Sequence, residues 1–263
     1  ISACLVGSEM CIRDRYNTRQ PIDAHVKKRL FWVIPVYVFL KVLMPIIIVF
    51  GVYGIWAVLT QDKPTQVIYP IALTLSFIVA EIVTLKCFFF LYQQKLRTIY
   101  QRLSSDIKPM LWPIVIVSCL TLLAYYGGQC IAHHLNQPWG FQHSQSEQYL
   151  SGMFTHPHAL PFVWVSMVVL RPLVEELIFR HLFIHELAKC IPMVVAMIFS
   201  IIADVVAHSY YYHSVLEIGI YSLIPIGAVI IYRWSQQNLL AAYVYHSMTQ
   251  CIIFLVLSYQ SYL

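Results

Sequence analysis

The residues best suited to chemistry lie in one short segment, RPLVEELIFR, which contains Arg171, Glu175, Glu176 and Arg180. Glu176 and Arg180 are four residues apart, so they share a helix face and can form an ion pair. Arg171 and Glu175 have the same spacing on an adjacent face. Two neighbouring carboxylates beside two guanidiniums are typical of a site that performs acid–base chemistry. The same groups would equally serve as a buried ladder of salt bridges between packed helices.

Two later segments carry further groups for acid–base chemistry. Asp204 and His208 are four residues apart, so they lie on one helix face. His246 and Gln250 have the same spacing in the last apolar segment. Counted along the helices, Glu175, His208 and His246 reach comparable depths and would converge on one cavity if the helices tilt. A single buried histidine is most simply structural, but such groups on three separate segments favour a shared site.

The composition indicates that these segments are membrane helices. Of the 263 residues, 59% are hydrophobic and only 11% are charged, whereas roughly a quarter of the residues in an average soluble domain are charged. This excludes a disordered chain and argues against a soluble enzyme. The net charge of +5 is spread between apolar runs, so we expect the lipid bilayer, and no nucleic acid, as the partner.

Seven apolar segments are long enough to cross a bilayer. None alternates like a barrel strand, so the predicted fold class is all-α, a polytopic bundle of about seven transmembrane helices. The predicted spans are Phe31–Leu59, Val67–Tyr92, Leu111–Ile131, Leu160–Leu187, Ile191–Tyr212, Val215–Trp234 and Leu239–Leu257. We expect one membrane domain, in which residues 16–158 supply three spans and an outer loop and residues 159–263 supply a four-helix core.

The N-terminus and the loop charges suggest an origin and an orientation. Residues 1–15, ISACLVGSEMCIRDR, resemble the peptide made when sequencing-adapter DNA is translated with a gene, so we expect them to be non-native. Lys and Arg residues concentrate in the loops on one side of the predicted bundle, and the other side carries only Lys63. We therefore expect a cytoplasmic N-terminus. Short loops and many tyrosines favour a prokaryotic cytoplasmic membrane.

Two opposite charges lie deep in the first two spans. Lys41 and Glu81 both fall roughly 17–18 Å from the cytoplasmic end of their helices, at about 1.5 Å per residue. A charge in hydrocarbon costs several kcal/mol unless it is paired or hydrated. We expect Lys41 and Glu81 to form a structural ion pair that joins the two helices; a direct catalytic role is the alternative.

The segment from Glu175 to Arg180 matches the EExxxR motif of the CPBP family. This family comprises CAAX-prenyl proteases and bacteriocin-processing or self-immunity proteins, also called Abi proteins. His208 stands where the family's second motif, FxxxH, has its histidine, and His246 stands at the histidine of the third motif, HxxxN or HxxxD. The resemblance covers about Pro161–Phe254.

The resemblance implies peptide-bond hydrolysis inside the membrane. Glu175, with His208, would activate a water molecule as general base. His246 and Gln250 would stabilise the tetrahedral oxyanion. The expected substrate is a membrane peptide or a lipidated protein, either CAAX-type or bacteriocin-related.

Glu176 completes the set of catalytic candidates, and Arg180, Asp204 and Arg171 would support them. Two positions depart from the family motifs, since Asp204 replaces the phenylalanine and Gln250 replaces the asparagine or aspartate. Asp204 would orient the His208 ring. The longer Gln250 would shift its amide by about an ångström, which can lower the rate of catalysis.

Cofactor and function leave alternatives open. We expect no required cofactor, and the absence of an HExxH sequence weakens a zincin-like interpretation. Because family members are often described as metalloproteases, a divalent metal such as zinc on Glu175, His208 and His246 is the alternative. A non-catalytic immunity or scaffold protein of the same fold would use the motifs to bind a peptide. A transporter is the third possibility, disfavoured because the chain lacks repeated halves.

Overall fold

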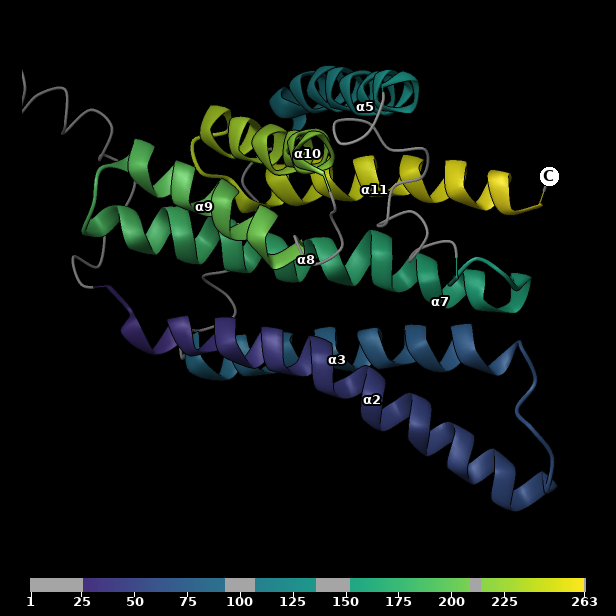
Figure 1. The fold of residues 1–263 in the computed structure, drawn as a ribbon. Coiled ribbons are helices and arrows are strands. Elements are labelled where there is room, and N and C mark those ends of the chain that lie inside the picture. The colour runs from purple at the N-terminus through teal and green to yellow at the C-terminus, as the bar shows by residue number, and fades with distance from the viewer. Residues whose placement is uncertain (1–25, 93–106, 136–151, 209–213, 263) are drawn as a thin grey trace, which may run out of the picture.

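The computed structural model describes residues 26–92, 107–135, 152–208 and 214–262. These residues form a bundle of helices and contain no strand (Figure 1). The predicted all-α membrane helix bundle is therefore confirmed. The segment 1–15 and most of the expected outer loop lie outside the described residues.

The long helices follow the predicted apolar segments closely. They are α2 (Val33–Thr60), α3 (Ile68–Tyr92), α5 (Leu111–His134), α9 (Met193–His208), α10 (Val215–Trp234) and α11 (Leu239–Tyr262). All except α9 are long and apolar enough to cross a membrane, and α9 is a shorter apolar helix. The end of the fifth predicted span, after His208, lies outside the described residues.

The fourth predicted span is a helix of mixed geometry. It runs through α7 (Leu160–Trp164), the π-helical segment η4 (Val165–Leu170), α8 (Arg171–Glu175) and the π-helical segment η5 (Glu176–Glu186). We call this run the composite helix. π-Helical geometry is rare overall, but where it occurs it often marks a functional site. The place where it begins in the composite helix therefore helps to locate the site. The change from α to π geometry falls between the two adjacent glutamates.

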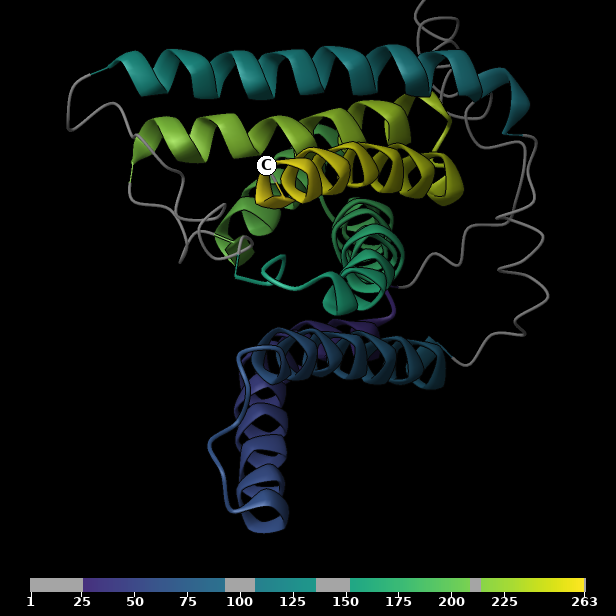
Figure 2. The same cartoon turned by 90° about the vertical axis from the view of Figure 1, so that its right-hand side faces the viewer.

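The composite helix occupies the middle of the bundle. On one side η4 and α8 contact α3, which packs along α2. On the other side the composite helix contacts α9 and α11, and α10 packs against α5, α9 and α11. The C-terminal half of α2 diverges from the other helices (Figures 1 and 2). Side chains on the composite helix can therefore meet groups from both layers of the bundle.

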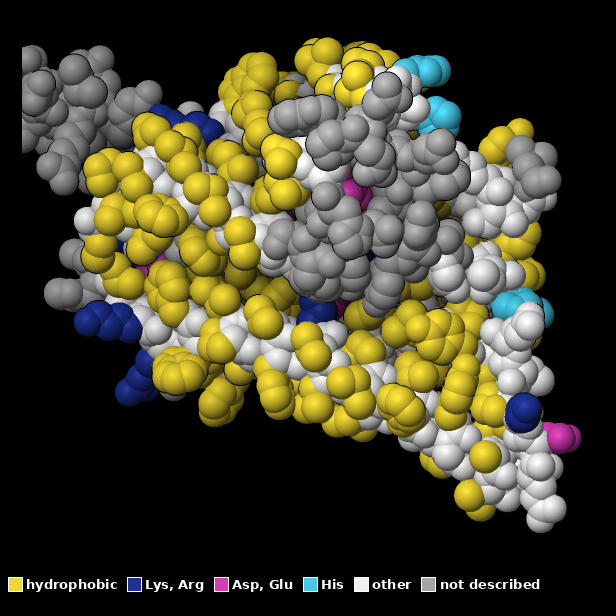
Figure 3. All heavy atoms as spheres, viewed as in Figure 1, with side chains coloured by type: hydrophobic (Ala, Val, Ile, Leu, Met, Phe, Trp, Pro, Cys, Tyr) yellow, Lys and Arg dark blue, Asp and Glu magenta, His cyan; other side chains and the backbone are white. Residues whose placement is uncertain are grey.

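The outer surface of the bundle is apolar. Figure 3 shows hydrophobic side chains over most of the face formed by α2 and α3, with the charged side chains mostly toward the ends. On α2, Phe50 and Val58 are 74% and 79% exposed. Soluble monomers rarely expose an apolar surface of this extent. The protein is an integral membrane protein.

A close contact between helices positions α11 against α10. A Cβ atom at Gly227 of α10 would overlap the hydroxyl group of Tyr245 and crowd Thr121 Oγ1. Tyr245 donates a hydrogen bond to Thr121 Oγ1 at 3.0 Å, and so links α11 to α5. Because Tyr245 precedes His246 in α11, this contact also helps to place the histidine.

Candidate active site

The two candidate acids lie at the change of helix geometry. Glu175 is the last residue of α8 and Glu176 is the first residue of η5. Both side chains are buried, with 2% and 0% of their surface exposed. Since successive helix residues point about 100° apart, the two carboxylates reach different neighbours. Glu175 contacts His208 of α9, and Glu176 contacts His246 of α11.

Arg180 is the charged centre of the cluster and is fully buried. Its Nε lies 3.2 Å from Glu176 Oε2, so the expected Glu176–Arg180 ion pair is present. Its Nη1 donates to Asp204 Oδ2 at 2.7 Å, and its Nη2 donates to the carbonyl oxygen of Pro225 at 3.1 Å. Buried charges need pairing of this kind, because an unpaired charge in the interior is strongly destabilising.

Asp204 contacts His208 through its backbone. His208 Nδ1 lies 2.8 Å from the carbonyl oxygen of Asp204, whereas the nearest carboxylate oxygen of Asp204 is 3.6 Å away. The carbonyl oxygen makes the shorter contact with the ring, while Arg180 holds the Asp204 carboxylate. The Asp204 carboxylate still lies within ion-pair distance of the ring, so its expected role in orienting His208 stays a prediction.

Glu175 and His208 share a proton. A carbonyl oxygen can only accept, so His208 Nδ1 carries the hydrogen of its bond to Asp204. His208 Nε2 lies 3.1 Å from Glu175 Oε1, and this contact requires one proton, on the ring or on the carboxylate. The pair is thus either imidazolium with carboxylate or imidazole with carboxylic acid. Either form can exchange a proton with a reacting molecule.

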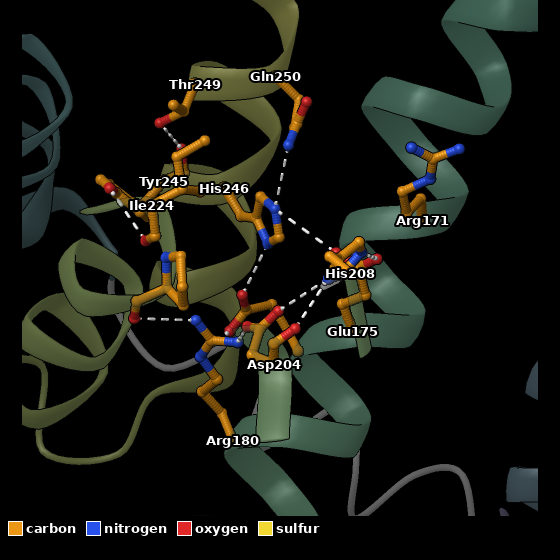
Figure 4. Close-up of polar contacts among 12 residues, drawn as sticks. Arg171, Glu175, Arg180, Asp204, His208, Ile224, Tyr245, His246, Thr249 and Gln250 are labelled. Atoms are coloured by element: carbon orange, nitrogen blue, oxygen red, sulfur yellow. Dashed lines mark hydrogen bonds and ion pairs between the residues drawn. The ribbon is translucent and has the colours of Figure 1, made fainter. Parts of the chain in front are cut away.

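His246 lies on the other side of Glu175, and the two side chains point toward one another in Figure 4. His246 Nδ1 lies 2.8 Å from Glu176 Oε1, a contact that fixes the ring. His246 Nε2 is 3.5 Å from the Gln250 amide nitrogen and 3.7 Å from Glu175 Oε2. One nitrogen of the ring is therefore held by Glu176, and the other faces Glu175 and Gln250.

Most of the candidate residues, but not Glu176 or Arg180, line a cavity of about 90 Å³. A space of this size holds several water molecules, since one water needs roughly 10–15 Å³ by the same measure. Its polar lining is Arg171, Glu175, Asp204, His208, His246 and Gln250, and its other lining residues are Tyr125, Met167, Val205, Tyr221, Ile224, Pro225 and Ile253. The structure thus brings the three expected segments to one cavity, and the cavity combines acid–base groups with apolar walls.

The direct Lys41–Glu81 ion pair that we expected is absent from the described residues. Glu81 accepts hydrogen bonds from Ser166 Oγ, at 3.0 Å to each carboxylate oxygen, and lies 3.8 Å from Arg171 Nε. Lys41 donates instead to the hydroxyl oxygen of Tyr37 at 3.4 Å. Equal depth in two helices does not determine which way each side chain points, and here the two charges point to different partners.

Tyr37 is a site residue that the sequence analysis missed. Its hydroxyl group donates to Glu175 Oε1 at 3.3 Å, from the first membrane helix to the composite helix. The signal available in the sequence was its spacing, because Tyr37 and the intramembrane Lys41 are four residues apart on one helix face.

A metal site does not fit the described residues. No group of three or more His, Cys, Asp or Glu side chains within those residues is arranged to hold a metal ion. The nitrogen and oxygen atoms that would have to face a metal contact each other, with His208 Nε2 3.1 Å from Glu175 Oε1. His246 Nδ1 is likewise occupied by Glu176.

The fold and the site together define a class of protein. It is a membrane helix bundle with glutamate, histidine and arginine side chains at a small internal cavity, and these groups can perform acid–base chemistry. Residues 157–252 match the family described as Rce1-like, Type II CAAX prenyl endopeptidase Rce1-like. The resemblance to the CPBP family, first indicated by the motifs, is thereby confirmed. The Rce1-like family consists of CAAX-type intramembrane proteases, which are hydrolases. No curated protein and no solved structure matches the chain.

Proposed function

We propose that the protein is an intramembrane endopeptidase that hydrolyses a peptide bond in a membrane-associated peptide or a lipidated protein. The similarity of residues 157–252 to type II CAAX prenyl endopeptidases supports a prenylated or otherwise lipid-anchored substrate. A bacteriocin-related peptide would reach the same cavity from the bilayer. In either case the substrate is already in the membrane when it meets the site.

Glu175 is the general base in this proposal. Its Oε1 atom is occupied by His208 and Tyr37, whereas its Oε2 atom lies 3.7 Å from the nearest ion-pair partner, His246 Nε2. Oε2 is therefore the atom that accepts a proton from a water molecule in the cavity. The resulting hydroxide attacks the scissile carbonyl carbon. The proton shared by Glu175 and His208 is then available to the departing amine as the carbon–nitrogen bond breaks.

His246 and Gln250 stabilise the oxyanion. The amide N–H of Gln250 and the Nε2 atom of His246 lie together on the cavity wall. Protonation of His246 at Nε2 turns it into a donor, and Glu176 on its Nδ1 side balances the added charge. Donors placed in advance at the developing negative charge lower the barrier. Arg180 and Asp204 act indirectly, because they hold Glu176 in position.

The single observation that carries the proposal is the 3.1 Å contact between Glu175 Oε1 and His208 Nε2 at the wall of the cavity. A salt-bridge ladder would satisfy its carboxylates with arginine or lysine. Here Glu175 is paired with a histidine, a side chain that commonly serves as a general acid or base.

The test uses the full chain reconstituted in liposomes with a quenched fluorescent peptide that ends in an S-farnesylated cysteine and three further residues. We expect cleavage by the wild-type protein and a fall in rate of roughly 100- to 10,000-fold for Glu175→Gln. Glu217→Gln is the matched control, because Glu217 is a buried glutamate that does not line the cavity. Equal rates for wild type and Glu175→Gln would contradict the proposal.

The location of the protein is a further part of the proposal. The Lys and Arg distribution supports a cytoplasmic N-terminus, and the short loops and many tyrosines support a prokaryotic cytoplasmic membrane. Cysteine labelling from one side of sealed vesicles tests this orientation. Reaction of a cysteine introduced at Lys63 from the cytoplasmic side would contradict it.

A further inference from the structure

The N-terminal helix α2 lies outside the region that matches the protease family, yet it contacts the proposed base. The match covers residues 157–252, whereas α2 spans Val33–Thr60. Tyr37 of α2 is 4% exposed and donates a hydrogen bond to Glu175 Oε1 at 3.3 Å. One turn later in the same helix, Lys41 lies 3.4 Å from the Tyr37 hydroxyl oxygen. A chain of two hydrogen bonds thus runs from α2 to the carboxylate.

The direction of this chain follows from its chemistry. The lysine ammonium group has donors and no acceptor, so the Tyr37 oxygen must accept from Lys41. The phenolic hydrogen then points at Glu175 Oε1, which accepts it. The positive charge of Lys41 polarises the phenol and strengthens the hydrogen bond that the phenol donates.

The ring of Tyr37 is buried and closely packed. Its ring belongs to an apolar cluster with Val33 of α2, Phe88 of α3 and Leu177 and Ile178 of η5. Packing in this cluster restrains the ring, so the hydroxyl group has little freedom to leave the carboxylate. Packing between α2 and the composite helix therefore maintains the contact between Tyr37 and Glu175.

The consequence concerns the rotation of the Glu175 carboxylate. The terminal torsion of a glutamate is soft, so the carboxylate plane must be held by its hydrogen-bond partners. Tyr37 and His208 both bind Oε1, from α2 and α9 respectively. With Oε1 held from two sides, Oε2 is directed toward His246 and the cavity.

We propose that Tyr37 is a positioning residue for peptide hydrolysis, which holds Glu175 Oε1 so that Oε2 faces the reacting water, and that Lys41 supports it. The expected effect on the rate of peptide hydrolysis rests on the proposed function. The structural part, the hydrogen bond itself, is independent of any substrate. The catalytic unit then includes helix α2 as well as the matched region.

The experiment compares Tyr37→Phe, Lys41→Met and the control Tyr53→Phe in the reconstituted full chain. Tyr37→Phe keeps the packed ring and removes only the hydroxyl group. Tyr53 is a second tyrosine of α2, and its ring lies against Tyr69. The protein is labelled with ¹³C-glutamate for infrared spectroscopy. The difference between its spectrum and that of Glu175→Gln isolates the Glu175 carboxylate band. The farnesylated fluorescent peptide is the probe for kinetics.

We expect Tyr37→Phe to shift the Glu175 band and to lower kcat roughly 10-fold, with little change in KM. This fall in kcat is at the low end of the effect expected from the loss of a hydrogen bond to a charged group. Lys41→Met should have a smaller effect of the same kind, and Tyr53→Phe should have none. An unchanged band in Tyr37→Phe overturns the inference. So does a shifted band without a fall in kcat when the wild-type protein is active. If the wild-type protein cleaves nothing but the band shifts, the proposed function fails and the positioning contact stands.

Discussion

Replacement of Asp204 by phenylalanine, the residue of the family's second motif, should destabilise this protein. Asp204 forms a 2.7 Å ion pair with Arg180, which is 0% exposed. Loss of one partner of a buried pair costs about 3–5 kcal/mol. The phenylalanine variant should lie in this range, because it removes the charge and introduces a larger side chain. Asp204→Asn should cost about 2–3 kcal/mol, since Arg180 keeps Glu176 and the Pro225 carbonyl oxygen.

Thermal unfolding of the purified protein in detergent measures this effect. A loss of about 2–3 kcal/mol corresponds to roughly 5–10 °C in Tm for a chain of this size. Ile202→Phe is the matched control, because Ile202 lies in the same helix and is 52% exposed on the outer surface. This control should leave Tm within a degree or two of wild type.

A double-mutant cycle separates the ion pair from other effects of the substitutions. Arg180→Met should be strongly destabilising alone, since it leaves Glu176 and Asp204 buried without their cation. Combined with Asp204→Asn, it should cost clearly less than the sum of the two single changes. Additive losses, or an Asp204→Phe protein as stable as wild type, would refute the reasoning.

Three further predictions concern packing, the oxyanion site and metal dependence. Gly227→Ala should lower Tm by several degrees because its Cβ would overlap the Tyr245 hydroxyl group, whereas Gly219→Ala, which meets no atom within 4 Å, should not; equal Tm values would contradict this contact. Gln250→Leu should lower kcat roughly 100-fold by removing an oxyanion donor, and Gln250→Asn should retain most activity; similar rates for both would exclude the role. Peptide cleavage should persist after EDTA treatment, and activity restored only by added zinc would contradict the metal-free mechanism.

The fold was largely predictable because membrane helices are encoded locally. A run of apolar residues must satisfy its backbone hydrogen bonds internally, so its length sets the length of the helix. The π-helical geometry of Glu176–Glu186 was not predictable in this way. Within this segment Glu176 and Arg180 contact other helices, and no local pattern encodes those contacts.

The site was predictable where spacing along one helix was enough. The four-residue spacing of Glu176 and Arg180 placed them on one face, and the structure contains their ion pair. The Lys41–Glu81 prediction failed because depth does not specify rotation about the helix axis. Tyr37 was not predicted because a tyrosine in an apolar helix is ordinary, and its contact with Glu175 is made across to another helix.

The most direct test of the central claim is comparative mapping of N- and C-terminal peptides. Membranes from the protein's own host would carry either the wild-type protein or Glu175→Gln at matched levels. We predict peptide ends that are present only with the wild-type protein, and these ends would identify the substrate and the cleaved bond. Identical sets of ends, with both proteins folded, would contradict proteolysis and favour a non-catalytic immunity or scaffold role.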